Sequence, residues 1–180
     1  QVLKNLRQLK DGDIVGFSAL TWSTNVMPLI QLGLKPMPVD CEIETLNATS
    51  KKLLMAIKNT DMKAFFITNA LGFAGDLDVI CDICNEKGII LLEDNCEALG
   101  TELASGKAGN FGLMASFSFF VAHHMSTIEG GMVCTDNSDI AEMLRIVRAN
   151  GWDRNLMASQ QHKWRKTYGV TSEFYAKYTF

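Results

Sequence analysis

Two adjacent histidines within an apolar stretch are the residues of this sequence best suited to chemistry. His123 and His124 follow the apolar, aromatic run Ser116–Val121, and Gly130-Gly131 lead into a second apolar run. Imidazole titrates near neutral pH, so a histidine held at such a place can move protons. Polar residues between two buried strands build a core poorly, whereas the mouth of a sheet holds them well. The two histidines are therefore candidates for a site at the edge of a sheet.

Four other residues stand at or near the ends of expected strands, where open α/β sheets bind ligands. Asp94 follows the most apolar run of the chain, and Glu97 lies about one helical turn further on. Trp22 comes just after the first expected strand, where its indole could stack on a flat ring. Ser118 offers a hydroxyl that can bind a phosphate. Each has a structural alternative: a helix-capping aspartate, a solvated carboxylate, a packed tryptophan and a serine bonded to backbone.

The elements that would position these residues alternate between short apolar runs and helical runs. Expected strands cover 14–18, 36–39, 64–68, 89–93, 116–121 and 131–135. Expected helices cover 21–33, 50–57 with Ser50 as the N-cap, 76–88 and 138–149. The strands are continuous apolar runs rather than alternating ones, which favours a mostly parallel sheet covered on both faces. We therefore predict a three-layer α/β/α fold.

Composition narrows the function classes. The 180 residues carry a net charge of -3 with acids and bases interspersed, so no nucleic-acid or membrane surface is expected. We find no apolar run that could span a bilayer and expect no signal peptide. Five cysteines favour reduced thiols and a cytoplasmic protein. Cys81 and Cys84 have the spacing of a redox pair, but both fall in the middle of an expected helix, which favours core thiols.

The segment around His123 resembles the cofactor-lysine loop of the pyridoxal-phosphate sugar aminotransferases, the DegT/DnrJ/EryC1/StrS group. In that family a serine precedes the Schiff-base lysine by five residues, and Thr-x-Glu-Gly-Gly-like residues follow. Here the serine is Ser118, the residue five positions later is His123, and Thr127–Gly131 follow. Histidine at that position is typical of the family's dehydratase branch. The resemblance covers nearly the whole chain and implies the large domain of a fold-type-I enzyme. His124 has no role that we can assign.

The resemblance also implies what the other candidates do. Asp94, within a Glu-Asp-x-Cys-x-x-x-Gly pattern, would pair with the pyridine nitrogen of pyridoxal phosphate and keep the ring cationic. Glu97 would reach the region of the ring hydroxyl, and Trp22 would stack on the ring face. Ser118 would bind the phosphate, together with a helix N-terminus expected upstream of this chain.

For the reaction, the resemblance implies a C3 dehydration of a nucleotide-linked 4-keto-6-deoxyhexose. Imidazole forms no stable imine, so the cofactor would be held non-covalently as pyridoxamine phosphate, with His123 as the proton-transfer base. Glutamate would supply the amine again after each turnover. Such enzymes make dideoxysugars such as colitose for the O-antigen of lipopolysaccharide, and related enzymes are homodimers.

A related branch binds a two-iron cluster, for which Cys96 would be one ligand. No cysteine lies between Thr135 and Phe180, so four thiolates cannot be assembled, and we expect no iron–sulfur cluster. The stretch Gly151–Leu156 resembles the GDP-sugar dehydratases, whereas Asn150 stands where many relatives have histidine. We expect residues 1–150 to form a cofactor-binding domain without its N-terminal part. Residues 151–180 would be an active-site loop toward a missing small domain.

Two other functions stay open. An ordinary sugar aminotransferase would need a lysine elsewhere, of which Lys107 is the nearest in sequence. A non-catalytic relative would have lost the lysine and kept a binding or regulatory role. Borohydride separates the first from the dehydratase, because it reduces a lysine-bound cofactor to a covalent adduct. A cofactor spectrum and a half-reaction with glutamate would distinguish an enzyme from the non-catalytic relative.

Overall fold

Two compact units make up the computed structural model, which describes residues 1–170. One unit is Lys10–Thr135, and the other combines residues 1–9 with the chain from Asp136 onward. The boundary that we predicted at residue 150 falls inside the second unit. Among residues 1–170, no helix has both the length and the apolar character that crossing a membrane requires.

A six-stranded sheet forms the centre of the larger unit, in the order β10-β9-β6-β5-β1-β2. Its strands are β1 (Ile14–Ser18), β2 (Lys35–Val39), β5 (Met62–Thr68), β6 (Ile90–Asp94), β9 (Met114–Ser118) and β10 (Gly131–Cys134). Neighbouring strands are parallel, except that β10 runs antiparallel to β9. The predicted strands and the mostly parallel sheet are therefore confirmed, with strand ends that differ by a few residues.

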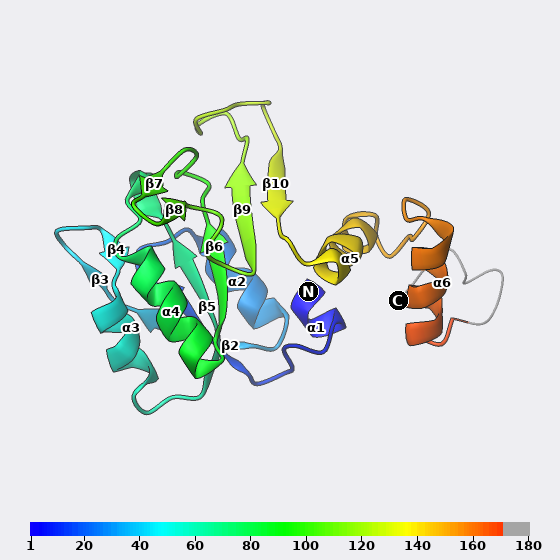
Figure 1. Cartoon of the computed structure of the whole chain (residues 1–180), viewed down its shortest axis with the longest axis horizontal. Coiled ribbons are helices and arrows are strands. Elements are labelled where there is room, and N and C mark those ends of the chain that lie inside the picture. Colours follow the sequence, from blue (N-terminus) through cyan, green and yellow to red (C-terminus); the bar gives the residue numbers. More distant parts are fainter. Residues whose placement is uncertain (171–180) are drawn as a thin grey trace. The chain divides into compact units, whose positions relative to one another are not determined.

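Helices cover both faces of this sheet, as a three-layer fold requires. Helices α3 (Ser50–Ile57) and α4 (Leu77–Lys87) lie on one face, and α2 (Ser23–Gln31) lies on the other (Figure 1). Two short hairpins, β3 (Cys41–Glu42) with β4 (Asn47–Ala48) and β7 (Glu102–Leu103) with β8 (Gly106–Lys107), lie outside the sheet, as does the 3-10 turn η1 (Ala70–Gly72). These hairpins had no signal in the apolar pattern, because two-residue strands are too short to show a period.

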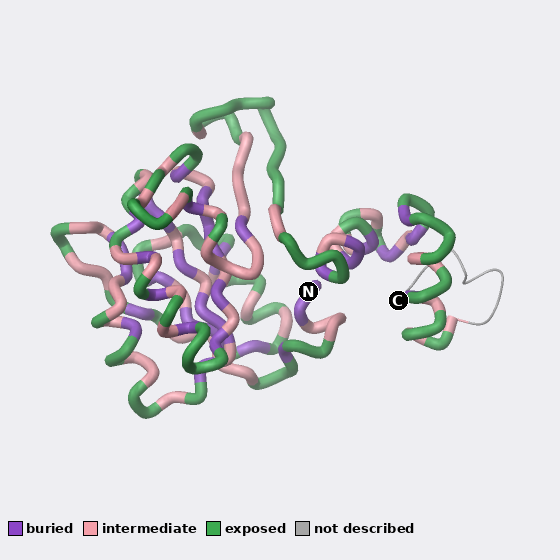
Figure 2. The backbone as a smooth tube through the Cα atoms, in the orientation of Figure 1, coloured by how far each residue is buried: buried purple, intermediate pink, exposed green. Residues whose placement is uncertain are grey.

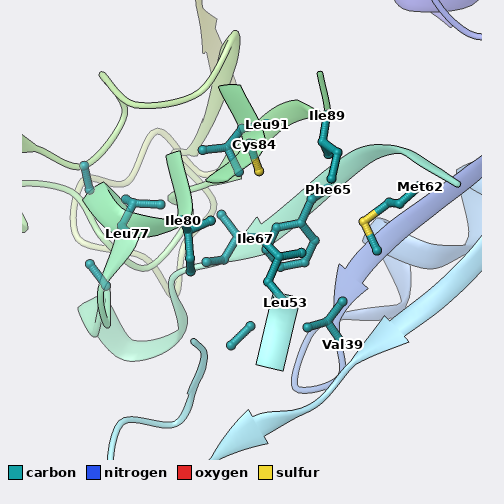
Figure 3. Close-up of a cluster of buried hydrophobic side chains, with 13 residues drawn as sticks. Val39, Leu53, Met62, Phe65, Ile67, Leu77, Ile80, Cys84, Ile89 and Leu91 are labelled. Atoms are coloured by element: carbon teal, nitrogen blue, oxygen red, sulfur yellow. The ribbon is translucent and has the colours of Figure 1, made fainter. Parts of the chain in front are cut away.

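The main apolar core lies between β5 and β6 and the helices α3 and α4 (Figure 3). Phe65 and Ile67 from β5 meet Leu53 from α3 and Ile80 from α4, and all four are fully buried. Burying such a side chain stabilises a fold by about 1.5–3 kcal/mol each. Cys84 belongs to this cluster, as the sequence predicted, and Cys81 packs against it partly buried.

The helix ends show which polar residues act as caps. Thr49, not Ser50, is the N-cap of α3, because Thr49 has the extended backbone and its side chain accepts from the Lys52 N–H. Ser50 is the first helical residue, and its hydroxyl hydrogen-bonds Asp76. Helix α4 begins after Asp76 and ends at Gly88, whose φ of 66° suits glycine, as predicted.

The smaller unit contains α1 (Val2–Asn5), α5 (Ser138–Arg148) and α6 (Ala158–Thr167). Residues 158–167 were expected to be loop, and the structure corrects this. Helix α6 is polar around most of its surface, so it lacks the apolar period of a helix. It is held by side-chain hydrogen bonds instead: Arg165 to Asp153 at 2.6 Å and Trp164 to Glu142 at 2.7 Å. Residues 171–180 of the expected loop lie outside the described residues.

Candidate active site

Polar side chains gather where four neighbouring parallel strands end. Ser18 is the last residue of β1, Thr68 is the last of β5 and Asp94 is the last of β6. Ser116 and Ser118 lie in the final three residues of β9. The register places Thr68 beside Asp94, and Asp94 beside Ser116. Because the carboxyl ends of parallel strands meet at one edge of the sheet, these groups share the position at which open α/β folds bind ligands.

Asp94 is buried, with 6% of its surface exposed, and both carboxylate oxygens accept hydrogen bonds. Oδ2 accepts from Asn25 Nδ2 at 2.6 Å. Oδ1 accepts from the Cys96 N–H at 3.1 Å and from the Ser116 hydroxyl at 3.3 Å. A buried carboxylate is costly unless it is hydrogen-bonded, and these three donors meet that requirement. The carboxylate is thus held in one orientation at the sheet edge.

Asn25 is a site residue that sequence reasoning missed. It is 7% exposed and lies in the first turn of α2, the helix whose N-cap is Trp22. Besides Asp94, its Nδ2 lies 2.9 Å from the hydroxyl oxygens of Thr21 and Thr68, which are themselves 2.6 Å apart. The sequence did contain one indication of this residue: three polar residues, 23–25, stand at the beginning of an otherwise apolar helix. Asparagine is unfavourable within helices, so its presence there indicates a specific contact.

The thiol of Cys96 lies next to the Asp94 carboxylate. Burial, and then the hydrogen bond and negative charge of Asp94, raise the pKa of Cys96 to about 12. The thiol is therefore neutral at physiological pH. Within residues 1–170, no group of three or more histidine, cysteine or acidic side chains is placed to hold a metal ion.

A second feature of this edge is an open pocket of about 330 Å³, lined by Leu71, Glu97, Ala122, His123 and His124. The histidines come from the largely exposed segment that joins β9 to β10 (Figure 2). The ring of His123 packs edge-on against Phe120 with centroids 6.0 Å apart. Its Nδ1 atom is buried and has no hydrogen-bond partner among the described residues. Buried polar atoms are normally paired, so this nitrogen is suited to a group that the chain itself does not supply.

The carboxylate of Glu97 is held at this pocket by the turn η1. Its Oε2 accepts from the Leu71 N–H at 2.8 Å. Leu71 has a left-handed backbone, with φ of 53° and ψ of 18°, which costs a non-glycine residue about 1–3 kcal/mol. The Thr101 hydroxyl fixes the turn from the other side by donating to the Gly72 carbonyl at 2.9 Å. Glu97 and His123 therefore line the same pocket.

Trp22, Ser118 and Asp94 lie at the same edge of the sheet. None of the three lines that pocket. Trp22 is 72% exposed, so it is not a core residue, and it follows Thr21, which belongs to the Asn25 network. The Ser118 oxygen accepts from the Phe120 N–H at 3.2 Å and keeps its hydrogen for a further bond. Ser118 shares a face of β9 with Ser116, since alternate strand residues point the same way.

This chain is similar to proteins of one known family. The profile of the DegT/DnrJ/EryC1/StrS aminotransferase family matches residues 2–174. GDP-4-keto-6-deoxy-D-mannose 3-dehydratase of Escherichia coli O55:H7 is 42% identical over 166 residues, which are 92% of this chain and 41% of that enzyme. The protein of the same name from Yersinia pseudotuberculosis is 44% identical over 149 residues, or 83% of this chain and 38% of its own.

A solved structure agrees with this match. GDP-4-keto-6-deoxymannose-3-dehydratase with a trapped PLP-glutamate geminal diamine superposes with a TM-score of 0.79 at 43% identity, covering 83% of this chain and 39% of that one. The chain thus spans about two fifths of the length of these relatives. With the matching fold and the matching profile, the chain belongs to the DegT/DnrJ/EryC1/StrS aminotransferase family.

Proposed function

We propose that this chain carries the cofactor site of a pyridoxal-phosphate-dependent 3-dehydratase. Its substrate would be a nucleotide-linked 4-keto-6-deoxyhexose, of which GDP-4-keto-6-deoxymannose is the first choice, and glutamate would be the amino donor. Support comes from the relatives, which are named for this dehydration, and from the solved relative that contains a PLP-glutamate adduct. The chain's own side chains add physical support.

The residues at the sheet edge fit the cofactor. Asp94 is a buried carboxylate held in one orientation at the sheet edge by hydrogen bonds to both of its oxygens, and such an anion suits a pyridinium N–H as its partner. The exposed indole of Trp22 offers a flat face for stacking on a ring. Ser118 would donate to the phosphate, and the remaining phosphate contacts would come from outside this chain. When bound, the cofactor supplies an amine for the sugar ketone and a ring that withdraws electrons.

His123 is the residue on which the proposal depends, because the resemblance of its loop to the family's cofactor-lysine loop would put it at the position of that lysine. Its imidazole lines the pocket that Glu97 also lines, and its buried Nδ1 is unpaired. An imidazole there would take a proton from the methylene carbon of the bound cofactor and deliver protons as the C3 hydroxyl leaves. Glu97, held by the Leu71 N–H, would approach the ring hydroxyl.

The aminotransferase alternative is less well supported. Lys107 lies exposed in β8 of the β7–β8 hairpin and is not among the pocket residues. Treatment of the cofactor-loaded full-length protein with borohydride should leave no covalent lysine adduct. A labelled lysine peptide would instead establish the aminotransferase.

The test of the proposed function uses the full-length protein with GDP-4-keto-6-deoxymannose, glutamate and pyridoxal phosphate. His123→Asn should reduce dehydration at least about 100-fold, since proton transfer is worth about 10²–10⁴ in rate. Cofactor affinity should stay close to that of the wild type, because asparagine removes no cofactor contact that Asp94 or Trp22 makes. His162→Asn, an exposed change in α6, is the matched control. Retained turnover in His123→Asn would overturn the assignment.

The finer expectations from the sequence belong to the same proposal. The product would enter synthesis of a dideoxysugar such as colitose for the O-antigen, in the cytoplasm. The enzyme would work as a homodimer without an iron–sulfur cluster. Another relative is named lipopolysaccharide biosynthesis protein RfbH, from Salmonella typhimurium, and it is 37% identical over 147 residues, or 82% of this chain and 33% of its own.

A further inference from the structure

The contact between Asn25 and Asp94 joins two parts of the chain that are 69 residues apart. Asn25 belongs to the helix that follows β1, whereas Asp94 ends β6. At 2.6 Å, this is the shortest of the three hydrogen bonds to the carboxylate. We propose that Asn25 is a positioning residue, which fixes the orientation of the Asp94 carboxylate toward the pyridine nitrogen of the cofactor. The inference rests on the proposed function.

The chemistry of the amide fixes the direction of this hydrogen bond. Nδ2 has two hydrogens and no acceptor, and three oxygens lie within bonding distance: those of Asp94, Thr21 and Thr68. The hydroxyls of Thr21 and Thr68 bond to each other, so one amide hydrogen satisfies that pair. The other hydrogen is left for Asp94. Asn25 therefore acts on the carboxylate only as a donor.

A neutral donor serves this role better than a cation would. Hydrogen bonds to a carboxylate favour its ionised form. A lysine or arginine in the place of Asn25 would do the same, but its charge would compete with the pyridinium for the carboxylate. The neutral amide orients the carboxylate without neutralising its negative charge, which can then pair with the pyridinium of the cofactor.

Asn25 also connects the carboxylate to the stacking residue. Its backbone N–H donates to the Trp22 carbonyl at 3.0 Å, in the first turn of α2. The indole would contact the face of the cofactor ring and Asp94 its edge, so one helical turn would set both contacts. The thiol of Cys96, which also hydrogen-bonds Asp94, stays neutral and therefore adds no second negative charge beside the carboxylate.

The experiment measures the protonation of the cofactor's ring nitrogen rather than the rate of turnover. Pyridoxamine 5'-phosphate labelled with ¹⁵N in the ring is bound to the full-length protein, and its nitrogen shift is recorded in a pH titration. In Asn25→Ala, which removes the donor without adding a charge, the bound ring nitrogen should lose its proton about one pH unit or more below the wild-type value. Cofactor affinity should fall about tenfold. Asn59→Ala, at an exposed asparagine in the turn before β5, should titrate like the wild type.

A double variant separates positioning from plain structural support. Asn25→Asp combined with Asp94→Asn exchanges the two side chains, and it restores an amide–carboxylate pair between α2 and β6. Thermal stability lost in Asn25→Asp should return, whereas protonation of the ring nitrogen should not, because the carboxylate now lies on the helix. Recovery of both would overturn the proposal, as would an unchanged titration in Asn25→Ala. A wild-type protein that binds no pyridoxamine phosphate would instead refute the proposed function itself.

Discussion

At the scale of single residues, the site combines groups with opposite exposure. Asp94 is buried and bonded by three donors, whereas Trp22 is 72% exposed and makes no core contribution. A buried carboxylate with matched donors is preorganised, so it needs no rearrangement when a cation arrives. An exposed indole gains by burying its face against a ligand. The two residues should therefore respond differently to substitution.

Replacement of Trp22 tests whether this indole serves a ligand. Trp22→Ala should weaken cofactor binding about tenfold, because base–aromatic stacking of comparable area is worth about 1–3 kcal/mol. The thermal midpoint should stay unchanged, since a mostly exposed side chain adds little to the core. Fluorescence titration with pyridoxamine phosphate and a thermal melt measure the two effects. Ile43→Ala, at an 86% exposed position in the β3–β4 turn, is the control. A large drop in the melting temperature of Trp22→Ala would contradict this assignment.

The buried thiol of Cys84 predicts a loss of stability in alkali. Burial, and then the neighbouring Cys81, raise the pKa of Cys84 from 9.0 to about 12. The raised value means that the stabilisation is complete below about pH 9 and is lost as the pH rises toward 12. Urea unfolding at neutral and alkaline pH should show a smaller alkaline loss in Cys84→Ala than in the wild type. Cys41→Ala, which removes a partly exposed thiol, should follow the wild type. Equal pH dependence in all three proteins would refute this.

Which site residues the sequence could predict depends on how local their signals are. Asp94 and His123 stand in or beside apolar strand runs, so their type and position indicate the sheet edge. Asn25 and Ser116 act through contacts with Asp94, which come from packing of a helix and strands remote in sequence. Such contacts have no period or spacing, and they become visible only in the folded chain.

At the scale of elements, the loop between β8 and β9 is held by one buried carboxylate. Glu93 Oε1 accepts from the N–H groups of Phe111 and Gly112 at 2.9 and 2.6 Å. Oε2 accepts from the Gly109 N–H at 2.6 Å and from Asn95 Nδ2 at 3.2 Å. Each oxygen of Glu93 thus accepts from two donors.

Glu93→Gln tests this arrangement, because the amide nitrogen would face two N–H donors in either orientation. We expect a loss of about 2 kcal/mol or more in the free energy of unfolding, as buried donors are left without acceptors. Urea denaturation measures it. Glu44→Gln, an exposed carboxylate in the β3–β4 turn, should change stability by less than about 0.5 kcal/mol. A Glu93→Gln protein as stable as that control would show that the loop does not depend on the carboxylate.

The elements themselves were predictable where hydrophobic pattern decides them. The continuous apolar strands and the amphipathic helices α4 and α5 follow from their sequences. Helix α6 was not predictable, because it is held by the hydrogen bonds that Trp164 and Arg165 donate to Glu142 and Asp153 rather than by an apolar face. Asn150 shows a similar effect at smaller scale: its φ of 56° after α5 suits asparagine, which tolerates left-handed backbone.

At the scale of the whole molecule, the segment between β9 and β10 exposes more apolar surface than a solvated loop needs. Its exposed apolar side chains, together with those of β10, are Phe120, Val121, Met125, Ile128, Met132 and Val133. Figure 2 shows this segment as an almost continuous exposed stretch. A segment that exposes several large apolar side chains is a candidate for an interaction site. The same segment carries His123, so a partner that covers it would also close the site.

The proposed homodimer makes this surface a testable interface in the full-length protein. Val121 is 62% exposed in this chain, and a second copy that covers it would desolvate any charge placed there. Val121→Glu should therefore weaken dimerisation at least about tenfold, since an unpaired buried charge costs several kcal/mol. Sedimentation velocity over a concentration series gives the dissociation constant for the wild type, for Val121→Glu and for the control Ile43→Glu. Dimerisation should weaken only in Val121→Glu, and dehydration should fall with it because the site loses its cover. A monomeric wild type, or a Val121→Glu dimer as tight as the control, would show that this surface has another purpose.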